Sequence, residues 1–168
     1  MIFYRSPGNE TGSRGPSVRT VRMLTSFSLA AYPIGGVLIA SGTSEAAGDI
    51  IWRDIAGLLL IALAVIAAAP VLVSRPQRIV GEETARLDEW ELQQRYRAIA
   101  SAYATISAII AALLFYAGLA SDFGWWLPRG YDALNAIFWG FFLYVTLLPT
   151  FFLAWSLDEA DAAEPFES

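Results

Sequence analysis

The stretch between Gly81 and Gly118 constrains the fold of this chain most strongly, because no proline or glycine interrupts it. Its first part is charged (GEETARLDEWELQQRYRA), and the part that follows is apolar (IASAYATISAIIAALLFYAGLA). A single helix over this stretch is about 57 Å long at 1.5 Å per residue. The hydrocarbon core of a bilayer is only about 30 Å thick. We therefore expect one part of this helix to lie in a membrane and the other part to extend outside it.

The composition is typical of a polytopic membrane protein. Of the 168 residues, 56% are hydrophobic and 16% are charged, whereas soluble domains carry roughly 25% charged residues. The charges lie in short blocks that separate four apolar stretches, at residues 23–42, 54–73, 98–120 and 131–157. This pattern predicts an all-α fold with four transmembrane helices. The third helix is expected to continue into the cytoplasm as a stalk over residues 82–97.

Both ends of the chain are predicted to be tails. Residues 1–22 are rich in Gly, Ser, Pro and Thr, and we expect them to be flexible. Residues 158–168 form an acidic tail. A cleaved signal peptide is the competing interpretation of the first apolar stretch, which ends in the small residues Ala40, Ser41 and Gly42. The tail and the stretch are both long for a signal peptide, so we expect a retained span.

The arginines predict the orientation of the chain in the membrane. Nine of them lie in the first tail and in the connection between the second and third spans: Arg5, Arg14, Arg19, Arg22, Arg75, Arg78, Arg86, Arg95 and Arg97. The other two connections carry one each, Arg53 and Arg129. The positive-inside rule then places both termini and the stalk in the cytoplasm, at a bacterial inner membrane. Trp125 and Trp126, in the last loop, are expected to be anchors at the membrane surface.

The residue inventory argues against several kinds of site. The chain has no Cys and no His, which removes disulfides, His or Cys metal ligands and imidazole acid–base chemistry. The interiors of the four spans hold no ionisable side chain, which argues against ion-coupled transport. The stalk acids point in several directions on a helix and fit a solvated face better than a catalytic or metal site: Glu82, Glu83, Asp88, Glu89 and Glu91.

We therefore expect no catalytic residues, no metal and no evident cofactor. The net charge of −5 gives no sign of nucleic-acid binding. Membrane lipids and other membrane proteins, or further copies of this chain, are the expected partners. A pigment or lipid pocket beside the polar residues of the last span stays open, although a packed aromatic helix is the simpler interpretation: Asn135, Tyr144, Thr146 and Thr150.

Small residues mark two candidate helix contacts. Gly35 and Gly36 in the first span allow a neighbouring helix to approach closely. In the third span, alanines recur at every fourth position, at Ala100, Ala104, Ala108 and Ala112. We favour packing of this ladder against another helix of the same chain, and a contact between copies of the chain is the alternative.

The charged half of the long helix carries one candidate apolar face. Leu87 and Trp90 are three residues apart, so they share a side of a helix. Two interpretations are equally consistent with this spacing. The face lies on the membrane surface, or it binds a partner.

The segment LDEWELQQRYRAIASAY resembles the juxtamembrane helix, with its LDE-x-E start, of small uncharacterised bacterial inner-membrane proteins. The later segment NAIFWGFFLYVTLLPTFFLAW is similar to the last span of such proteins. The resemblance covers about half the chain. It implies an architecture and no catalytic residues.

These observations lead to an expected function class. We expect a non-enzymatic integral membrane protein that acts through protein–protein interaction, as an accessory or assembly subunit of a larger inner-membrane complex. A homo-oligomeric channel or an uncoupled small-molecule transporter is the alternative. No acid–base pair or nucleophile that would indicate an enzyme is visible in the sequence.

Overall fold

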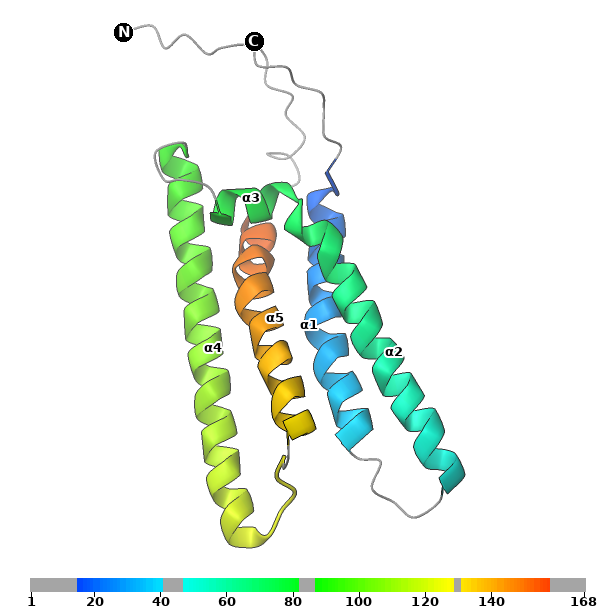
Figure 1. The fold of residues 1–168 in the computed structure, drawn as a ribbon. Coiled ribbons are helices and arrows are strands. Elements are labelled where there is room, and N and C mark those ends of the chain that lie inside the picture. Colours follow the sequence, from blue (N-terminus) through cyan, green and yellow to red (C-terminus); the bar gives the residue numbers. More distant parts are fainter. Residues whose placement is uncertain (1–14, 41–46, 82–86, 129–130, 158–168) are drawn as a thin grey trace, which may run out of the picture.

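Five helices make up the described part of the chain (Figure 1). The structure is a computed structural model that describes residues 15–40, 47–81, 87–128 and 131–157. The helices are α1 (Val18–Ala40), α2 (Ala47–Leu72), α3 (Arg75–Gly81), α4 (Glu89–Phe123) and α5 (Tyr131–Ser156). These residues contain no strand, and α1, α2, α4 and α5 are each long and apolar enough to cross a membrane. The predicted all-α fold with four membrane helices is confirmed.

Predicted boundaries of α1, α2 and α4 need correction. Helix α2 begins at Ala47 and not at residue 54. Helix α1 begins at Val18, so Arg19 and Arg22, which the sequence assigned to the flexible tail, belong to the first helix. Helix α4 runs to Phe123 and not to Ala120. Residues 1–14 and the acidic tail at 158–168 lie outside the described residues.

Helix α1 begins earlier than the sequence predicted because Ser17 caps its first turn. The Ser17 side-chain oxygen accepts a hydrogen bond from the amide of Thr20 at 3.2 Å, which is the usual role of a serine at a helix start. The first turn also buries Val18 and Val21. Capping and burial together extend the helix over residues whose composition alone indicates a loop.

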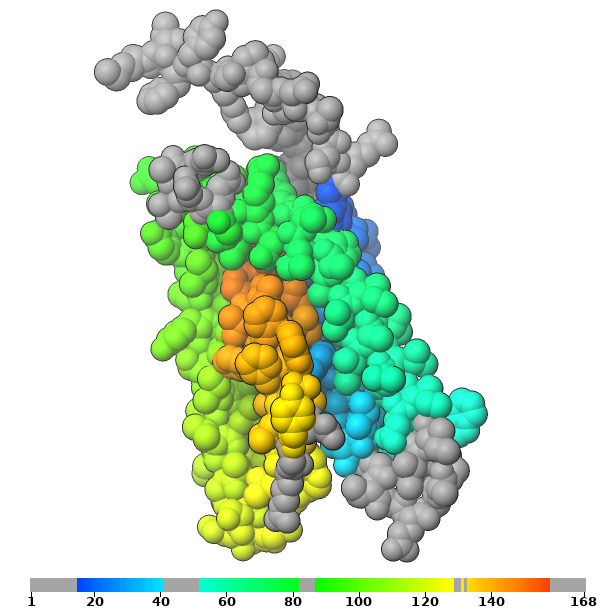
Figure 2. Space-filling model, in the orientation of Figure 1, coloured from blue at the N-terminus to red at the C-terminus, as the bar shows by residue number. Residues whose placement is uncertain are grey.

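Helix α5 lies between α4 and α1, and α1 lies between α5 and α2 (Figure 1). One end of the molecule holds the start of α1, the ends of α2 and α5, and the start of α4, and α3 lies across this end (Figures 1 and 2). A buried apolar cluster contributed by α1, α3, α4 and α5 joins the helices here: Val18, Ile79, Ala98, Leu153 and Leu157. We call this end, which carries most of the described arginines, the arginine end.

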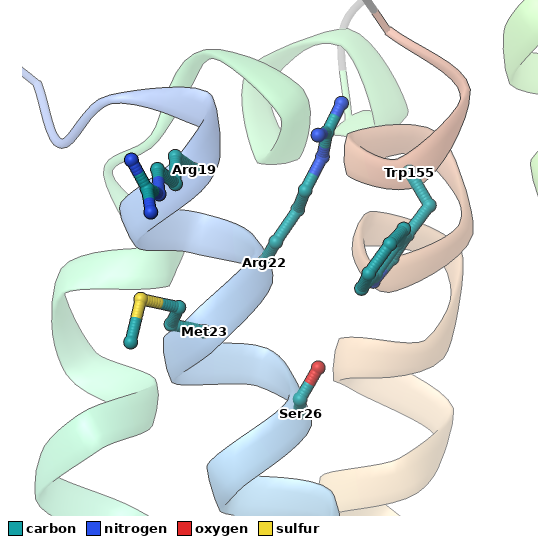
Figure 3. A pocket seen from close by; sticks show the side chains of 5 residues that line it. All are labelled: Arg19, Arg22, Met23, Ser26 and Trp155. Atoms are coloured by element: carbon teal, nitrogen blue, oxygen red, sulfur yellow. The ribbon is translucent and has the colours of Figure 1, made fainter.

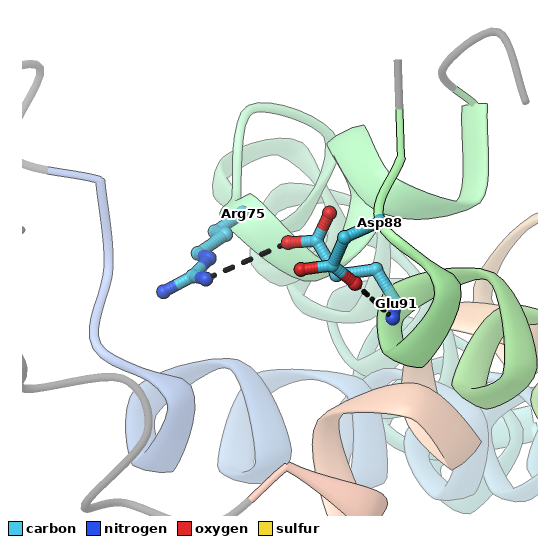
Figure 4. A network of polar contacts seen from close by, with 3 residues as sticks. All are labelled: Arg75, Asp88 and Glu91. Atoms are coloured by element: carbon cyan, nitrogen blue, oxygen red, sulfur yellow. Dashed lines mark hydrogen bonds and ion pairs between the residues drawn. The ribbon is translucent and has the colours of Figure 1, made fainter. Parts of the chain in front are cut away.

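The single helix predicted from Gly81 onward is wrong at its beginning. Helix α3 ends at Gly81 and a separate helix, α4, begins at Glu89; residues 82–86 lie outside the described residues. Asp88 is extended, with φ −72° and ψ 169°, and its Oδ1 accepts a hydrogen bond from the amide of Glu91 at 2.6 Å (Figure 4). Asp88 is therefore the N-cap of α4. The predicted stalk is a helix only from Glu89 to residue 97.

The Glu91 carboxylate connects the start of α4 to α3. It lies 3.7 Å from the Arg75 guanidinium (Figure 4). Both side chains are partly exposed, so this ion pair stabilises the fold by less than about 1 kcal/mol. Burial of Ile79 and Ala98 in the apolar cluster of the arginine end is the stronger contribution to the α3–α4 contact.

Helices α1 and α2 approach each other closely at a pair of glycines. A Cβ atom built on Gly35 would lie 2.7 Å from the Gly57 carbonyl oxygen, and one built on Gly57 would lie 2.7 Å from the Gly35 carbonyl oxygen. Little hydrophobic force acts between helices in a bilayer, so such close van der Waals contact determines which helices associate. The predicted close approach is confirmed for Gly35. A Cβ atom on Gly36 would contact nothing within 4 Å.

We expect Gly35→Ala to destabilise the protein by about 1–3 kcal/mol, because the added methyl group overlaps a backbone oxygen that cannot move aside. Gly36→Ala is the matched control, since it adds the same group one residue later in open space. The measurement is thermal unfolding of the purified protein in detergent. Equal unfolding temperatures for the two variants would contradict this account of the α1–α2 contact.

Candidate functional site

Polar side chains in the spans connect the helices to one another. The Ser28 hydroxyl of α1 donates a hydrogen bond to the carbonyl of Ala64 in α2 at 2.8 Å. The Tyr32 hydroxyl of α1 donates to the carbonyl of Ala136 in α5 at 2.9 Å. Among the described residues, no buried side-chain nitrogen or oxygen lacks a partner. These groups therefore serve packing and do not converge on a vacant polar site.

A third hydrogen bond between a side chain of one helix and a carbonyl of another forms because of Pro33. Proline has no amide hydrogen, so the carbonyl four residues earlier, that of Leu29, loses its helical donor. The Tyr144 hydroxyl of α5 donates to this carbonyl at 2.6 Å. A neighbouring helix thus satisfies a carbonyl group that α1 cannot satisfy by itself.

The polar residues of the last span do not form a common pocket. Asn135 is exposed, and the Thr146 hydroxyl donates to the Phe142 carbonyl of its own helix at 2.8 Å. Thr150 is buried and bonds to the Gln77 side chain of α3. Tyr144 bonds to α1, so these four side chains do not face a common space. The structure gives no support to a pigment or lipid pocket formed by these four residues.

The alanine ladder of the third span lies on the outside of the chain. Its four members are all exposed: Ala100, Ala104, Ala108 and Ala112. The side of α4 that packs on the rest of the chain buries Ala98, Ala102 and Ala120. The interpretation that the ladder packs against another helix of the same chain is therefore wrong. A contact with another chain or with lipid stays open.

Helical geometry shows which small residues share the outer side of α4. A step of four residues advances about 40° around a helix, so Ala112 has turned about 120° away from Ala100. Ser107, Ala111 and Gly118 lie within about 20° of the direction of Ala100, and all three are exposed. We call Ala100, Ala104, Ser107, Ala111 and Gly118 the outer small-residue face of α4. It points away from the side that buries Ala102.

Leu87 and Trp90 do not form one exposed face. Leu87 precedes α4 and packs against the apolar cluster of the arginine end. The Trp90 side chain, in the first turn of α4, is 42% exposed. The predicted shared face is wrong because the helix begins at Glu89 and Leu87 turns inward before it. A contact of Trp90 with the membrane surface or with a partner stays a prediction.

Trp125 and Trp126 follow the end of α4. Gly124 adopts the left-handed conformation, with φ 67°, and ends the helix. The Trp125 ring stacks on Phe123 with 5.5 Å between centroids, and the Trp126 carbonyl accepts a hydrogen bond from the Tyr116 hydroxyl at 2.8 Å. Both indoles are exposed. Their role as membrane anchors stays a prediction.

Arg22 of α1 contacts the end of α5 at the arginine end. Its Nε donates a hydrogen bond to the Ala154 carbonyl at 2.7 Å, and an Nη donates to the Leu157 carbonyl. The guanidinium also lies 5.4 Å from the centre of the Trp155 ring. A cation here satisfies carbonyls at the end of α5 and complements the negative end of its dipole. Sequence reasoning missed this role because it placed Arg22 in a tail.

Comparison of the chain with family models, with curated proteins and with solved structures finds no match. The resemblance of the Leu87–Tyr103 segment to a juxtamembrane helix therefore stays a prediction. In the described part of the chain, no group of three or more acidic residues is arranged to hold a metal ion. The features that stand out are the outer small-residue face of α4 and the surroundings of Arg22.

We expect Tyr144→Phe to lower the stability of the protein by about 1 kcal/mol, because it leaves the Leu29 carbonyl without a donor. In a Pro33→Ala background the same change should cost much less, since residue 33 then supplies the helical amide hydrogen. The measurement is a double-mutant cycle from equilibrium unfolding in detergent. A coupling of zero between the two sites would show that Pro33 is not the reason for this bond.

Proposed function

We propose that this protein is a non-enzymatic integral membrane protein of a bacterial inner membrane that acts by binding another membrane protein. In this role it is an accessory or assembly subunit of a larger complex. The outer small-residue face of α4 is the observation that carries the proposal. Residues of this face let the backbone of a second helix approach closely, as Gly35 and Gly57 do within the chain.

The position of α4 supports this function. Helix α4 packs mainly on α5 and lies at one edge of the molecule (Figures 1 and 2). It has 35 residues and is the longest helix of the described chain. Its most apolar window is also the least buried of the four membrane helices, at 11%. A long helix at an edge, with small residues outward, presents a surface that suits a helix of a neighbouring protein.

A homo-oligomeric channel is the second candidate. Ser107 is exposed on the outer small-residue face of α4, and a hydroxyl group of this kind is able to line a polar axis between copies of a chain. The absence of ionisable residues from the span interiors fits this candidate only for an uncoupled pore. The two candidates differ in what α4 contacts, which is a different protein or the same one.

We expect Ala104→Leu with Ala111→Leu to release a partner that co-purifies with the wild-type protein in mild detergent. The leucines hold the second helix away and cost about 1–3 kcal/mol of association free energy, or roughly fivefold to 150-fold in affinity. The unfolding temperature of the chain itself should stay unchanged, because both alanines are exposed. The measurement is quantitative mass spectrometry of affinity-purified complexes, with native-gel size as a second readout.

Two control variants make this experiment specific. Ala62→Leu places the same substitution at an exposed position of α2 and should retain the partner. Ala102→Leu, at a residue only 2% exposed, should destabilise the chain itself. Unchanged partner recovery in the Ala104→Leu, Ala111→Leu variant would refute the proposed surface. Loss of a complex made only of copies of this chain would favour the channel.

We also propose that the arginine end faces the cytoplasm. The described arginines of α1, of α3 and of the first turns of α4 gather at this end: Arg19, Arg22, Arg75, Arg78, Arg95 and Arg97. Arg53 lies near the start of α2, at the opposite end. The positive-inside rule predicts the orientation from this asymmetry.

The orientation is tested with reporter fusions. A reporter that is active only in the periplasm should be silent when fused after Ser168 and active when inserted near Gly124. This follows from an even number of spans with the arginine end inside. The reverse pattern of activity would place the arginine end outside the cytoplasm.

A further inference from the structure

A groove between α1 and α5 opens at the arginine end (Figure 3). Five residues line it: Arg19, Arg22, Met23, Ser26 and Trp155. The first four are at steps of three, one and three along α1, so they share one side of that helix. Trp155 approaches from α5 (Figure 3). The groove is therefore built by two helices that are adjacent in space and distant in sequence.

The polar side chains that line the groove are two arginines and a serine, and none of its described lining residues is acidic. Arg22 uses Nε and one Nη for the carbonyls of α5, and a guanidinium has five N–H groups, so others remain. Arg19 is exposed and forms no ion pair with the residues that the structure describes. These arginine donors suit an anion that has several oxygen acceptors, which is the chemistry of a phosphate group.

The position of the groove indicates where this phosphate comes from. The groove lies near the ends of two membrane-spanning helices, at the depth expected for lipid headgroups. Below the arginines, Met23 is 67% exposed, and Phe27 lies one helical turn further along the same helix and is also exposed. Trp155 is exposed beside them, and its indole combines an apolar ring with a polar N–H, as is usual at a membrane surface.

We propose that this groove binds the headgroup of an anionic phospholipid. Arg19 and the free donors of Arg22 contact the phosphate at the rim of the groove. The Ser26 hydroxyl, which lies deeper (Figure 3), contacts a glycerol ester oxygen, and an acyl chain lies along Met23 and Phe27. Arg22 has two functions in this arrangement, because it caps the end of α5 and contacts the lipid. The site does not depend on the proposed protein–protein function, since it is formed by α1 and α5 and not by the outer face of α4.

The test is a binding titration of the full-length protein, purified and delipidated in mild detergent, followed by native mass spectrometry. The probes are phosphatidylglycerol, phosphatidylcholine with the same acyl chains, and inorganic phosphate. We expect phosphatidylglycerol to bind more tightly than phosphatidylcholine. Arg19→Gln should weaken phosphatidylglycerol binding about fivefold, the effect expected for one arginine near a charged membrane surface. Ser26→Ala should weaken it by a smaller factor.

Arg97→Gln is the matched control, because it removes the same charge at an exposed position of α4 outside the groove. It should leave phosphatidylglycerol binding unchanged. Equal losses for Arg19→Gln and Arg97→Gln would show a diffuse charge effect and overturn the site, as would equal binding of the two lipids. Displacement of phosphatidylglycerol by an equal concentration of inorganic phosphate would overturn the lipid as the ligand. If Arg19→Gln unfolds in a thermal control, retention of full binding by Ser26→Ala overturns the proposal.

Discussion

A backbone carbonyl without a donor is unfavourable in a hydrocarbon environment, and Pro33 creates one in the first helix. The hydroxyl of Tyr144 on α5 satisfies it, and this requirement fixes how far α5 is rotated and how deep it lies against α1. Tyr32, next to the proline, forms a second bond in the opposite sense, to the Ala136 carbonyl. The two tyrosines thus make the contact between α1 and α5 specific.

Contact between backbones is the second determinant of the fold. At Gly35 and Gly57 the absence of side chains brings α1 and α2 so close that a methyl group on either residue would overlap the other helix. On α4 the same kind of surface occurs without a partner in the chain. Two surfaces of similar chemistry therefore differ in position: the first completes the fold, and the second is the one that we propose for an assembly.

The sequence predicts features that depend on nearby residues in the chain. It does not predict features that depend on which helices pack together. The four membrane helices follow from hydropathy alone. The start of α4 was missed although its signal is local: Leu87, Asp88, Glu91 and Leu92 have the spacing of an N-cap with a hydrophobic residue on each side. The outward direction of the alanine ladder and the contact of Arg22 with the end of α5 were not predictable from one sequence. They depend on which helices become neighbours, and periodicity does not contain that information.

The order of the helices in space differs from their order in the chain, and this matters while the protein is being made. Helices α1 and α2 form a close pair that is complete as soon as both have entered the membrane. Helix α4 is synthesised next, but apart from a short contact with α3 its partner is α5, which is still to come. The last helix must then enter between two elements that are already present. Until it does, α4 lacks the helix of its own chain that covers most of its buried side, so it is the helix that gains most from the arrival of α5.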